Sequence, residues 1–313
     1  MKRILIVILF SFSLGNPSPA IELSVNESDD AITVYRDLKP ILNYQKSVMD
    51  SPPGESDLFQ RSGFIHPIYT PAGKIVTSIH PPESIHHMGM WHAWVHANFR
   101  DREIDFWNLK KGVGTVRYVS TSKIQRNKNT IEFSVRQNHV ALQFAENQEE
   151  VILEELFTIR VFSDEYSNIF DYEIVQRNVT DVPLELPVHR YGGGIAYRAP
   201  ENWGETQDAY LTSEGHDRTT GHTTRGRWCA MHGPVGDGIA TVVIMCHPLN
   251  NDAPQRMRIR PKNRVFFNYV PTQENESSIQ PGKCLSMKYR VLTFDDRPSV
   301  NTIEKYWKAF ASE

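Results

Sequence analysis

Cysteine is scarce in this sequence: Cys229, Cys246 and Cys284 are the three among 313 residues. No CxxC spacing occurs, and an odd number of thiols leaves at least one unpaired. The sequence therefore excludes the disulfide framework of a small secreted domain. One disulfide bond stays open as an alternative, and the sequence does not identify its pair.

An excess of positive charge is also lacking, as are long apolar segments. Lys and Arg number 34 against 37 Asp and Glu, so the net charge is −3 and the attraction that drives nucleic-acid binding is missing. No apolar run reaches the roughly 20 residues that a membrane span needs. We therefore expect no nucleic-acid partner and no integral membrane segment in the mature chain.

The first twenty residues have the pattern of a secretory signal peptide. Lys2 and Arg3 supply positive charge, residues 4–14 are apolar apart from serines, and small residues and prolines follow. A short buried N-terminal strand is the alternative. We expect residues 1–20 to be the signal peptide, residues 21–313 to form a single β-sandwich domain, and the protein to be periplasmic or secreted.

Alternation of apolar and polar residues dominates the rest of the chain, of which 40% is hydrophobic. Many short strands with turn signals between them, and no helices separating them, predict a mainly β fold, a large antiparallel β-sandwich. The candidate strands are residues 131–136, 151–161, 169–175, 238–246, 265–270 and 285–294.

A short C-terminal helix is the one convincing helical segment. It is expected to begin after Ser299, because Ile303, Trp307 and Phe310 then form an apolar stripe at helical spacing. This stripe predicts that the helix packs on an outer sheet face.

The densest group of chemically active residues lies between residues 80 and 107, where His86, His87, His92 and His96 fall within eleven positions. Imidazole can transfer a proton near neutral pH or bind a metal. If residues 91–99 form a strand, His92 and His96 share one partly exposed face. His86 and His87 precede it in a loop, where structure alone has little need of imidazole, and both are candidate catalytic residues.

A second candidate segment precedes the glycine run at residues 192–194. His189 is a third candidate catalytic residue, and the planar guanidinium of Arg190 is suited to binding a carboxylate. Three glycines allow a ligand or a neighbouring backbone to approach closely, with a β-bulge or turn as the alternative. The run lacks the GxGxxG order of a nucleotide loop, and no GxSxG motif occurs for a serine nucleophile.

Other residues are candidate substrate-binding groups, each with a surface or structural role as its alternative. They are Arg61, His66, Trp91, Asp105, Arg227 and His247.

Four motifs together resemble the PmoA-like family, a family of unknown function whose members are often labelled "methane oxygenase PmoA". The motifs are residues 61–67, His86-His87-x-Gly89-x-Trp91, residues 190–194, and His247-Pro248-x-Asn250. The resemblance extends from about Phe59 to about Phe294. The methane monooxygenase subunit of that name has many membrane-spanning helices, so the resemblance does not imply methane oxidation here.

A second resemblance is to galactose mutarotase-like proteins. Residues 85–89 are similar to the Leu-His-Gly-Gly segment of aldose mutarotases, and residues 187–191 to their Asn-His-x-Tyr segment. This implies a β-supersandwich with a sugar cleft, in which His87 or His86 polarises the ring oxygen and His189 is the general acid. The mutarotase base is a glutamate in a late strand, but here Glu274 comes several residues too late, so mutarotation itself does not follow.

Taken together, these features predict an exported carbohydrate-active protein that acts on a sugar or oligosaccharide by histidine acid/base chemistry, as an epimerase, glycoside hydrolase or lyase. Trp91, Trp94 or Trp107 is expected to form the cleft wall, since aromatic rings stack on sugars. A non-catalytic carbohydrate-binding protein is one alternative, and a metal enzyme using His86 or His87 with His189 is another. The sequence identifies no cofactor.

Overall fold

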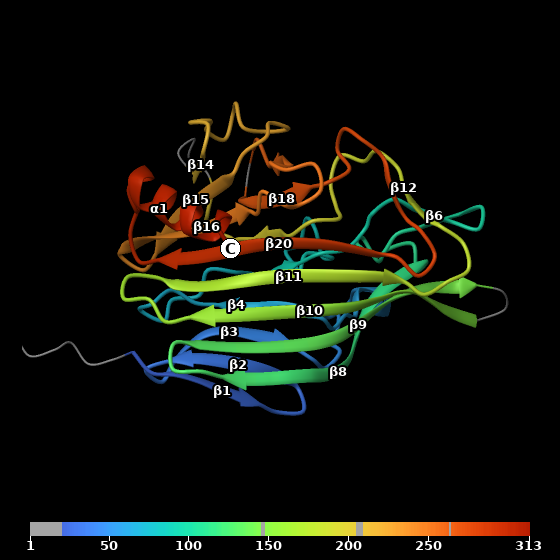
Figure 1. Ribbon diagram of the computed structural model, residues 1–313, viewed down its shortest axis with the longest axis horizontal. Helices are drawn as coiled ribbons and strands as arrows, with labels where there is room; N and C mark the ends of the chain where they lie inside the picture. The colour runs from blue at the N-terminus through green and yellow to red at the C-terminus, as the bar shows by residue number, and fades with distance from the viewer. Residues whose placement is uncertain (1–20, 145–147, 205–208, 263) are drawn as a thin grey trace, which may run out of the picture.

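The computed structural model describes residues 21–144, 148–204, 209–262 and 264–313, so the predicted signal peptide lies outside the described residues. The described strands pair antiparallel and form three sheets (Figure 1). The predicted fold class, mainly β and antiparallel with a short C-terminal helix, is confirmed.

The first sheet carries the candidate site at one end. Its strand order is β1 (Leu23–Glu27), β2 (Ala31–Arg36), β3 (Lys39–Gln45), β4 (Phe64–Ile68), β5 (Met90–Trp91), β13 (Ala196–Arg198), β18 (Phe266–Val270) and β17 (Arg256–Ile259).

The second sheet contains the longest strands and spans the molecule in Figure 1. Its order is β14 (Tyr210–Thr212), β15 (Trp228–Val235), β16 (Gly238–Cys246), β20 (Cys284–Phe294), β11 (Asn168–Asn178), β10 (Gln148–Phe162), β9 (Thr130–Phe144) and β8 (Gly114–Arg126).

A smaller third sheet and two helical segments complete the described elements. They are β19 (Ser277–Ile279), β12 (Leu184–Leu186), β6 (Ala97–Phe99) and β7 (Arg102–Ile104), the 3-10 helix η1 (Asp57–Phe59), and the helix α1 (Val300–Ala311).

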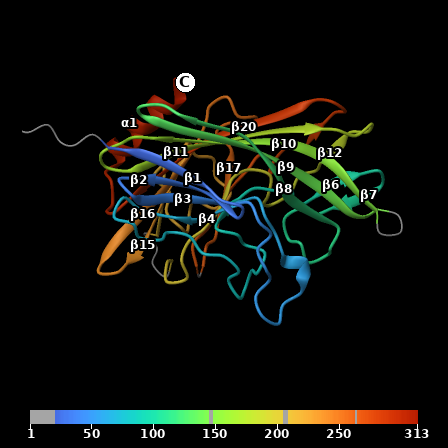
Figure 2. The same ribbon diagram turned by 90° about the horizontal axis from the view of Figure 1, so that it is seen from below.

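The first and second sheets pack face to face and share one hydrophobic core. Alternation along β10 buries every second side chain, such as Phe157 and Ile159, and leaves Leu156 exposed. The ring of Tyr44, on β3, lies 5.9 Å from that of Phe157 across the interface between the layers. Figure 2 shows the two layers from the side, with the loop that contains η1 extending away from the second sheet.

Helix α1 covers the second sheet from outside, as predicted. The Ser299 hydroxyl caps it by accepting a hydrogen bond from the Thr302 amide. Ile303 and Phe310 are buried against β15, β16 and β20, and Trp307 is partly buried there. None of the described helices is long and apolar enough to cross a membrane.

One expectation from the sequence is corrected here, and the structure answers the question of a disulfide bond, which the sequence left open. Residues 91–99 are not one strand: β5 ends at Trp91, β6 begins at Ala97, and the segment between them is irregular. All three cysteines are free thiols: Cys229 and Cys246 are buried, and Cys284 is exposed, so no disulfide bond forms.

Candidate functional site

The candidate site consists of two adjoining cavities. The larger is a cleft of about 730 Å³ between the loop with η1, the loop that enters β5 and the segment after β7. The smaller, of about 120 Å³, lies beside it above β17 and β18. Ser84 and His86 line both. The cleft is otherwise lined by Glu55, Ser56, Leu58, Phe59, Pro82, Glu83, Ile85, Asp105, Asn108, Lys110 and Lys111.

Local backbone hydrogen bonds place His86 and His87 at these cavities. The amide of Ser84 donates to the Pro81 carbonyl, and the amide of His87 donates to the Ser84 carbonyl, which forms a tight turn. Gly89 then has a φ of +66°, and a side chain on it would overlap the Ile65 carbonyl of the neighbouring strand. The loop before β5 is thereby held against the first sheet.

Both histidines are neutral at pH 7. Burial lowers the pKa of His86 to about 4, and nearby positive charge on Arg61, Arg260 and Arg198 contributes to this shift. Burial, with repulsion from His86, Arg198 and Arg260, holds the pKa of His87 well below its usual range. Each ring can therefore accept a proton or a hydrogen bond at neutral pH.

Aromatic packing fixes the orientation of His87. Its ring stacks on Phe266 of β18, with centroids 4.7 Å apart, and meets His86 edge-on at 4.7 Å. His87 is 6% exposed, and its Nδ1 atom has no hydrogen-bond partner among the described residues. A buried polar atom of this kind is normally satisfied by water or a ligand.

Arg190 and Tyr191 reach the smaller cavity from the loop between β12 and β13. The Tyr191 hydroxyl donates to Asn108 Oδ1 at 3.1 Å, which joins this loop to the wall of the larger cleft. The following Gly192 and Gly193 adopt φ values of +101° and +84°, and a Cβ on Gly193 would lie 2.4 Å from the Trp94 ring, so the glycine run allows a close approach of neighbouring chain.

His189 lies apart from the other two candidate catalytic histidines and is not part of the lining of either cavity. Its ring stacks on His96 at 5.7 Å and meets Tyr191 edge-on at 4.9 Å. Burial lowers its pKa, and repulsion from His96 and Arg190 adds to this effect. Tyr191 therefore separates His189 from the cavity that His87 lines.

Two predicted residues are buried beneath the site. Asp105 lines the larger cleft, but its carboxylate accepts hydrogen bonds from the amides of Trp107 and Asn108 at 2.9 and 2.8 Å, which caps a turn. Trp91 is fully buried between Trp107 and His87, as is Trp107 itself. The tryptophans predicted to stack on a sugar are therefore all buried: Trp91 and Trp107 pack beneath the His87 ring, and Trp94 donates a hydrogen bond to Gln176.

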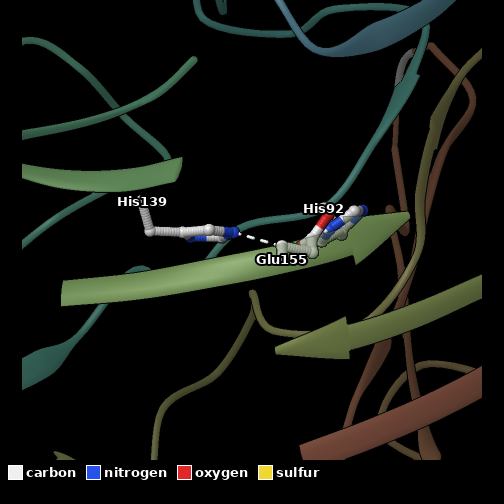
Figure 3. A group of neighbouring side chains, drawn as sticks. All are labelled: His92, His139 and Glu155. Carbon is white, nitrogen blue, oxygen red and sulfur yellow. Dashed lines mark hydrogen bonds and ion pairs between the residues drawn. The ribbon is translucent and has the colours of Figure 1, made fainter. Parts of the chain in front are cut away.

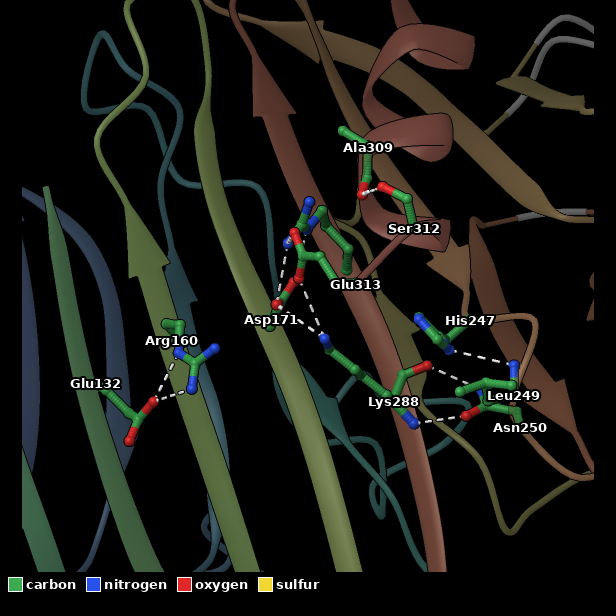
Figure 4. Close-up of polar contacts among 11 residues, drawn as sticks. Glu132, Arg160, Asp171, His247, Leu249, Asn250, Lys288, Ala309, Ser312 and Glu313 are labelled. Carbon is green, nitrogen blue, oxygen red and sulfur yellow. Dashed lines mark hydrogen bonds and ion pairs between the residues drawn. The ribbon is translucent and has the colours of Figure 1, made fainter.

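Four other predicted residues lie outside both cavities. His66 bonds to Thr77 Oγ1 at 2.9 Å. Arg61 is in the core and donates to the His92 carbonyl at 3.2 Å. Arg227 pairs with Glu304 of α1 at 2.8 Å, and the His247 ring packs edge-on against Phe310 of α1 at 4.9 Å. Figure 4 shows His247 accepting a hydrogen bond from the Leu249 amide.

The sequence analysis missed two arginines of the smaller cavity, Arg258 on β17 and Arg260 just after it. They alternate with buried Met257 and Ile259, a pattern that is also typical of an ordinary solvent-exposed strand face. Neither is near the histidine loop in sequence. Only the pairing of β17 with β18 brings them beside the His87 ring.

A buried polar network was missed as well, and we call it the Glu155 network. Glu155 has no exposed side-chain area, and its Oε2 atom lies 2.8 Å from His92 Nε2 and 2.9 Å from His139 Nε2 (Figure 3). Gln176 and Gln137 donate to the same carboxylate at 2.8 and 2.7 Å. His92, predicted to be a partly exposed strand residue, is 2% exposed instead.

His92, His139 and Glu155 are also the group of possible metal ligands in the described chain, with candidate atoms within 4.8 Å of one another. Two imidazoles and a carboxylate suit zinc or iron. Both Nε2 atoms already hydrogen-bond to the carboxylate and hold the group together without an ion, although the buried Nδ1 atom of His139 has no partner among the described residues. The predicted metal site of the cleft histidines with His189 does not occur as such a group in the described residues.

Comparison with known proteins gives one family and several distant structures. A family model described as "Family of unknown function (DUF6807)" matches residues 31–308. No curated protein matches the chain. The predicted name of the PmoA-like family is not among the matches.

Similar solved structures include a candidate aldose 1-epimerase from Klebsiella pneumoniae, which is 12% identical in sequence. The match covers 93% of this chain and 87% of that chain, with a TM-score of 0.43. A galactose mutarotase related enzyme from Lactobacillus acidophilus is 9% identical, covers 89% and 100%, and has a TM-score of 0.38. A galactose mutarotase-like protein from Clostridium acetobutylicum is 7% identical, covers 88% and 99%, and has a TM-score of 0.38. At these scores the likeness does not extend to site residues or activity.

Proposed function

The chain belongs to the DUF6807 family of unknown function, and we propose that it is an exported carbohydrate-active protein whose paired cavities bind a sugar or oligosaccharide. Export is proposed from the pattern of residues 1–20. The observation that carries the sugar proposal is the cleft of about 730 Å³ that opens onto the neutral imidazole of His86.

The lining of this cleft is chemically suited to a molecule with many hydroxyl groups. Carboxylate, hydroxyl, amide and ammonium groups from Glu55, Ser84, Asn108 and Lys111 lie among apolar side chains such as Phe59. Such groups donate and accept hydrogen bonds in a fixed pattern, which a sugar requires and an apolar ligand does not. The volume is within the range of small-molecule sites.

The histidines supply proton transfer in this proposal. His86 lines both cavities and is uncharged at neutral pH, so it acts as the general base or as the acceptor of a sugar hydroxyl proton. His87, held by Phe266, hydrogen-bonds to the bound sugar. His189, behind Tyr191, lines neither cavity and therefore has no direct contact with the sugar in this proposal. Epimerisation, glycoside cleavage and elimination all include a proton transfer of the kind that His86 would perform.

Turnover assays on an oligosaccharide panel test this proposal. His86→Gln should reduce turnover by roughly 10²–10⁴-fold, as for loss of a general base. His216→Gln is the matched control, since His216 is partly exposed at the β14–β15 connection and lines neither cavity. Unchanged turnover in His86→Gln contradicts the catalytic role, and a protein that binds no oligosaccharide contradicts the proposal itself.

The pH profile separates this role from a purely structural one. A base is active in its unprotonated form, so activity should fall as the pH drops through about 4, the pKa of His86. An unperturbed histidine would instead give an acid limb near pH 6.5. Binding without turnover at any pH would identify the protein as a non-catalytic carbohydrate-binding protein.

A further inference from the structure

The smaller cavity has an unusual concentration of positive charge. Arg190, Arg258 and Arg260 all line its volume of about 120 Å³. They come from two separate parts of the chain, the loop before β13 and the strand β17 with its next residue. Three guanidinium groups around so small a space repel one another unless an anion lies among them.

The neighbouring acidic group balances only part of this charge. Glu83 pairs with Arg260 at 3.2 Å, and it is shared with the buried Arg198 and with Arg264. Arg190 and Arg258 form no ion pair with any residue that the structure describes. The Arg258 guanidinium contacts instead the neutral acceptor His222 Nε2 at 3.3 Å, and burial and its two arginine neighbours lower its pKa.

The rest of the wall contributes no carboxylate to neutralise this positive charge. His86 and His87 are uncharged at pH 7, and Phe266 is apolar. The Tyr191 ring faces the guanidiniums of Arg190 and Arg258 at 5.3 and 6.0 Å, a cation–π contact that offsets only part of the charge. The His87 Nδ1 atom is buried and unpartnered among the described residues. Charge-assisted hydrogen bonds are strongest in such a partly desolvated setting.

We infer that the smaller cavity binds the carboxylate of an acidic sugar, a uronate residue, between Arg190 and Arg258. This inference rests on the proposed function and narrows its substrate class. The cavity has room for one charged group rather than a whole sugar ring, and the adjoining cleft receives the rest of the oligosaccharide, with His86 at the junction. A planar guanidinium matches a carboxylate with two parallel hydrogen bonds.

The test is calorimetric binding of uronate oligosaccharides built from galacturonate, glucuronate, mannuronate or guluronate. Each is paired with its carboxyl-reduced counterpart, which keeps the linkage and loses the charge. The wild type should bind at least one acidic oligosaccharide about tenfold or more tightly than its reduced form. Arg258→Gln should remove this preference without weakening the binding of the reduced form.

Two further variants keep the result interpretable. Arg190→Gln alters an exposed side chain and should act like Arg258→Gln if the latter does not fold. Arg117→Gln removes a surface arginine that pairs with Glu149 and should bind like the wild type. Equal binding of acidic and reduced forms overturns the carboxylate inference and leaves the sugar proposal intact.

Two further binding results would also overturn the carboxylate inference. Binding of neither form contradicts the proposed function and the inference with it. Sulfated neutral oligosaccharides are the third probe, because a sulfate ester offers the same anionic recognition. Tighter binding of these than of every uronate overturns the assignment to a carboxylate.

Discussion

Replacing Glu155 by glutamine exchanges one carboxylate oxygen for an amide NH₂ group. This small change should destabilise the protein strongly. The carboxylate accepts four hydrogen bonds from nitrogen donors, at 2.7 to 2.9 Å, and has no exposed area. In Glu155→Gln, the new amide N–H₂ group must face donors such as Gln137 or Gln176. About two charge-assisted bonds are lost, each worth about 1.5–3 kcal/mol.

The free energy of unfolding should therefore fall by about 3–5 kcal/mol, which is the usual loss when one partner of a buried ion pair is removed. Thermal denaturation followed by circular dichroism measures this, with a decrease in Tm of roughly 6–15 °C expected for a chain of this size. Glu154→Gln is the matched control, because Glu154 is the exposed neighbour on the same strand. It should change stability by less than about 0.5 kcal/mol.

The difference between wild type and Glu155→Gln should depend on pH in a defined way. Burial alone would raise the pKa of Glu155, but charge and hydrogen bonds from His92 and His139 hold it well below its usual range. A lowered pKa gives stability that is present above the unfolded value, about 4.3, and lost as the pH falls towards the folded value. The difference should shrink as the pH falls below about 5; a difference under about 1 kcal/mol at pH 7 would refute this account of the network.

Three other perturbations test the packing and the Glu155 network. Gly194→Ala should destabilise the protein by about 1–3 kcal/mol in urea unfolding, because the new methyl group would overlap the Tyr269 carbonyl and the Tyr289 hydroxyl. In the control Gly238→Ala, the new methyl group meets no atom closer than 3.6 Å, so its effect on stability should be nearly zero. Phe310→Ala should lower the free energy of unfolding by about 3–5 kcal/mol, because a fully buried ring is lost. Val300→Ala truncates an exposed side chain of the same helix and should have a small effect. Equal melting curves for the two variants would contradict the packing of α1. Prolonged chelator treatment should leave Tm unchanged, since hydrogen bonds from both Nε2 atoms to the carboxylate already hold the network together; a marked decrease would identify it as a metal site.

The strands could be predicted from sequence because burial on a sheet follows a period of two. Residues 238–246 are β16 as predicted, and residues 285–294 fall within β20. The prediction failed at residues 91–99, where Trp91 ends β5 and Trp94 is buried in the irregular segment that follows. Side chains that are buried in all directions leave no alternation to detect, so such a segment looks like a strand of aromatic residues.

The candidate site could be predicted only where its residues are unusual for their local context. His86, His87 and Arg190 line the smaller cavity together, as histidines in a loop and an arginine before a glycine run had indicated. Arg258 could not be identified, because its contact with them depends on strand pairing across the sheet. A usable signal did exist for the Glu155 network: a glutamate stands at an inward position of a strand, where the alternation calls for an apolar side chain.

The most direct test of the central claim is to observe which histidine rings respond when an oligosaccharide binds. Side-chain NMR of histidine-labelled protein, titrated with the best ligand of the panel, gives a signal for each ring, assigned by single substitution. The cavities predict that the signals of His86 and His87 shift, while those of His216 and His247 stay in place. Shifts at His247, beside α1, with none at His86 would place the sugar elsewhere and contradict the account.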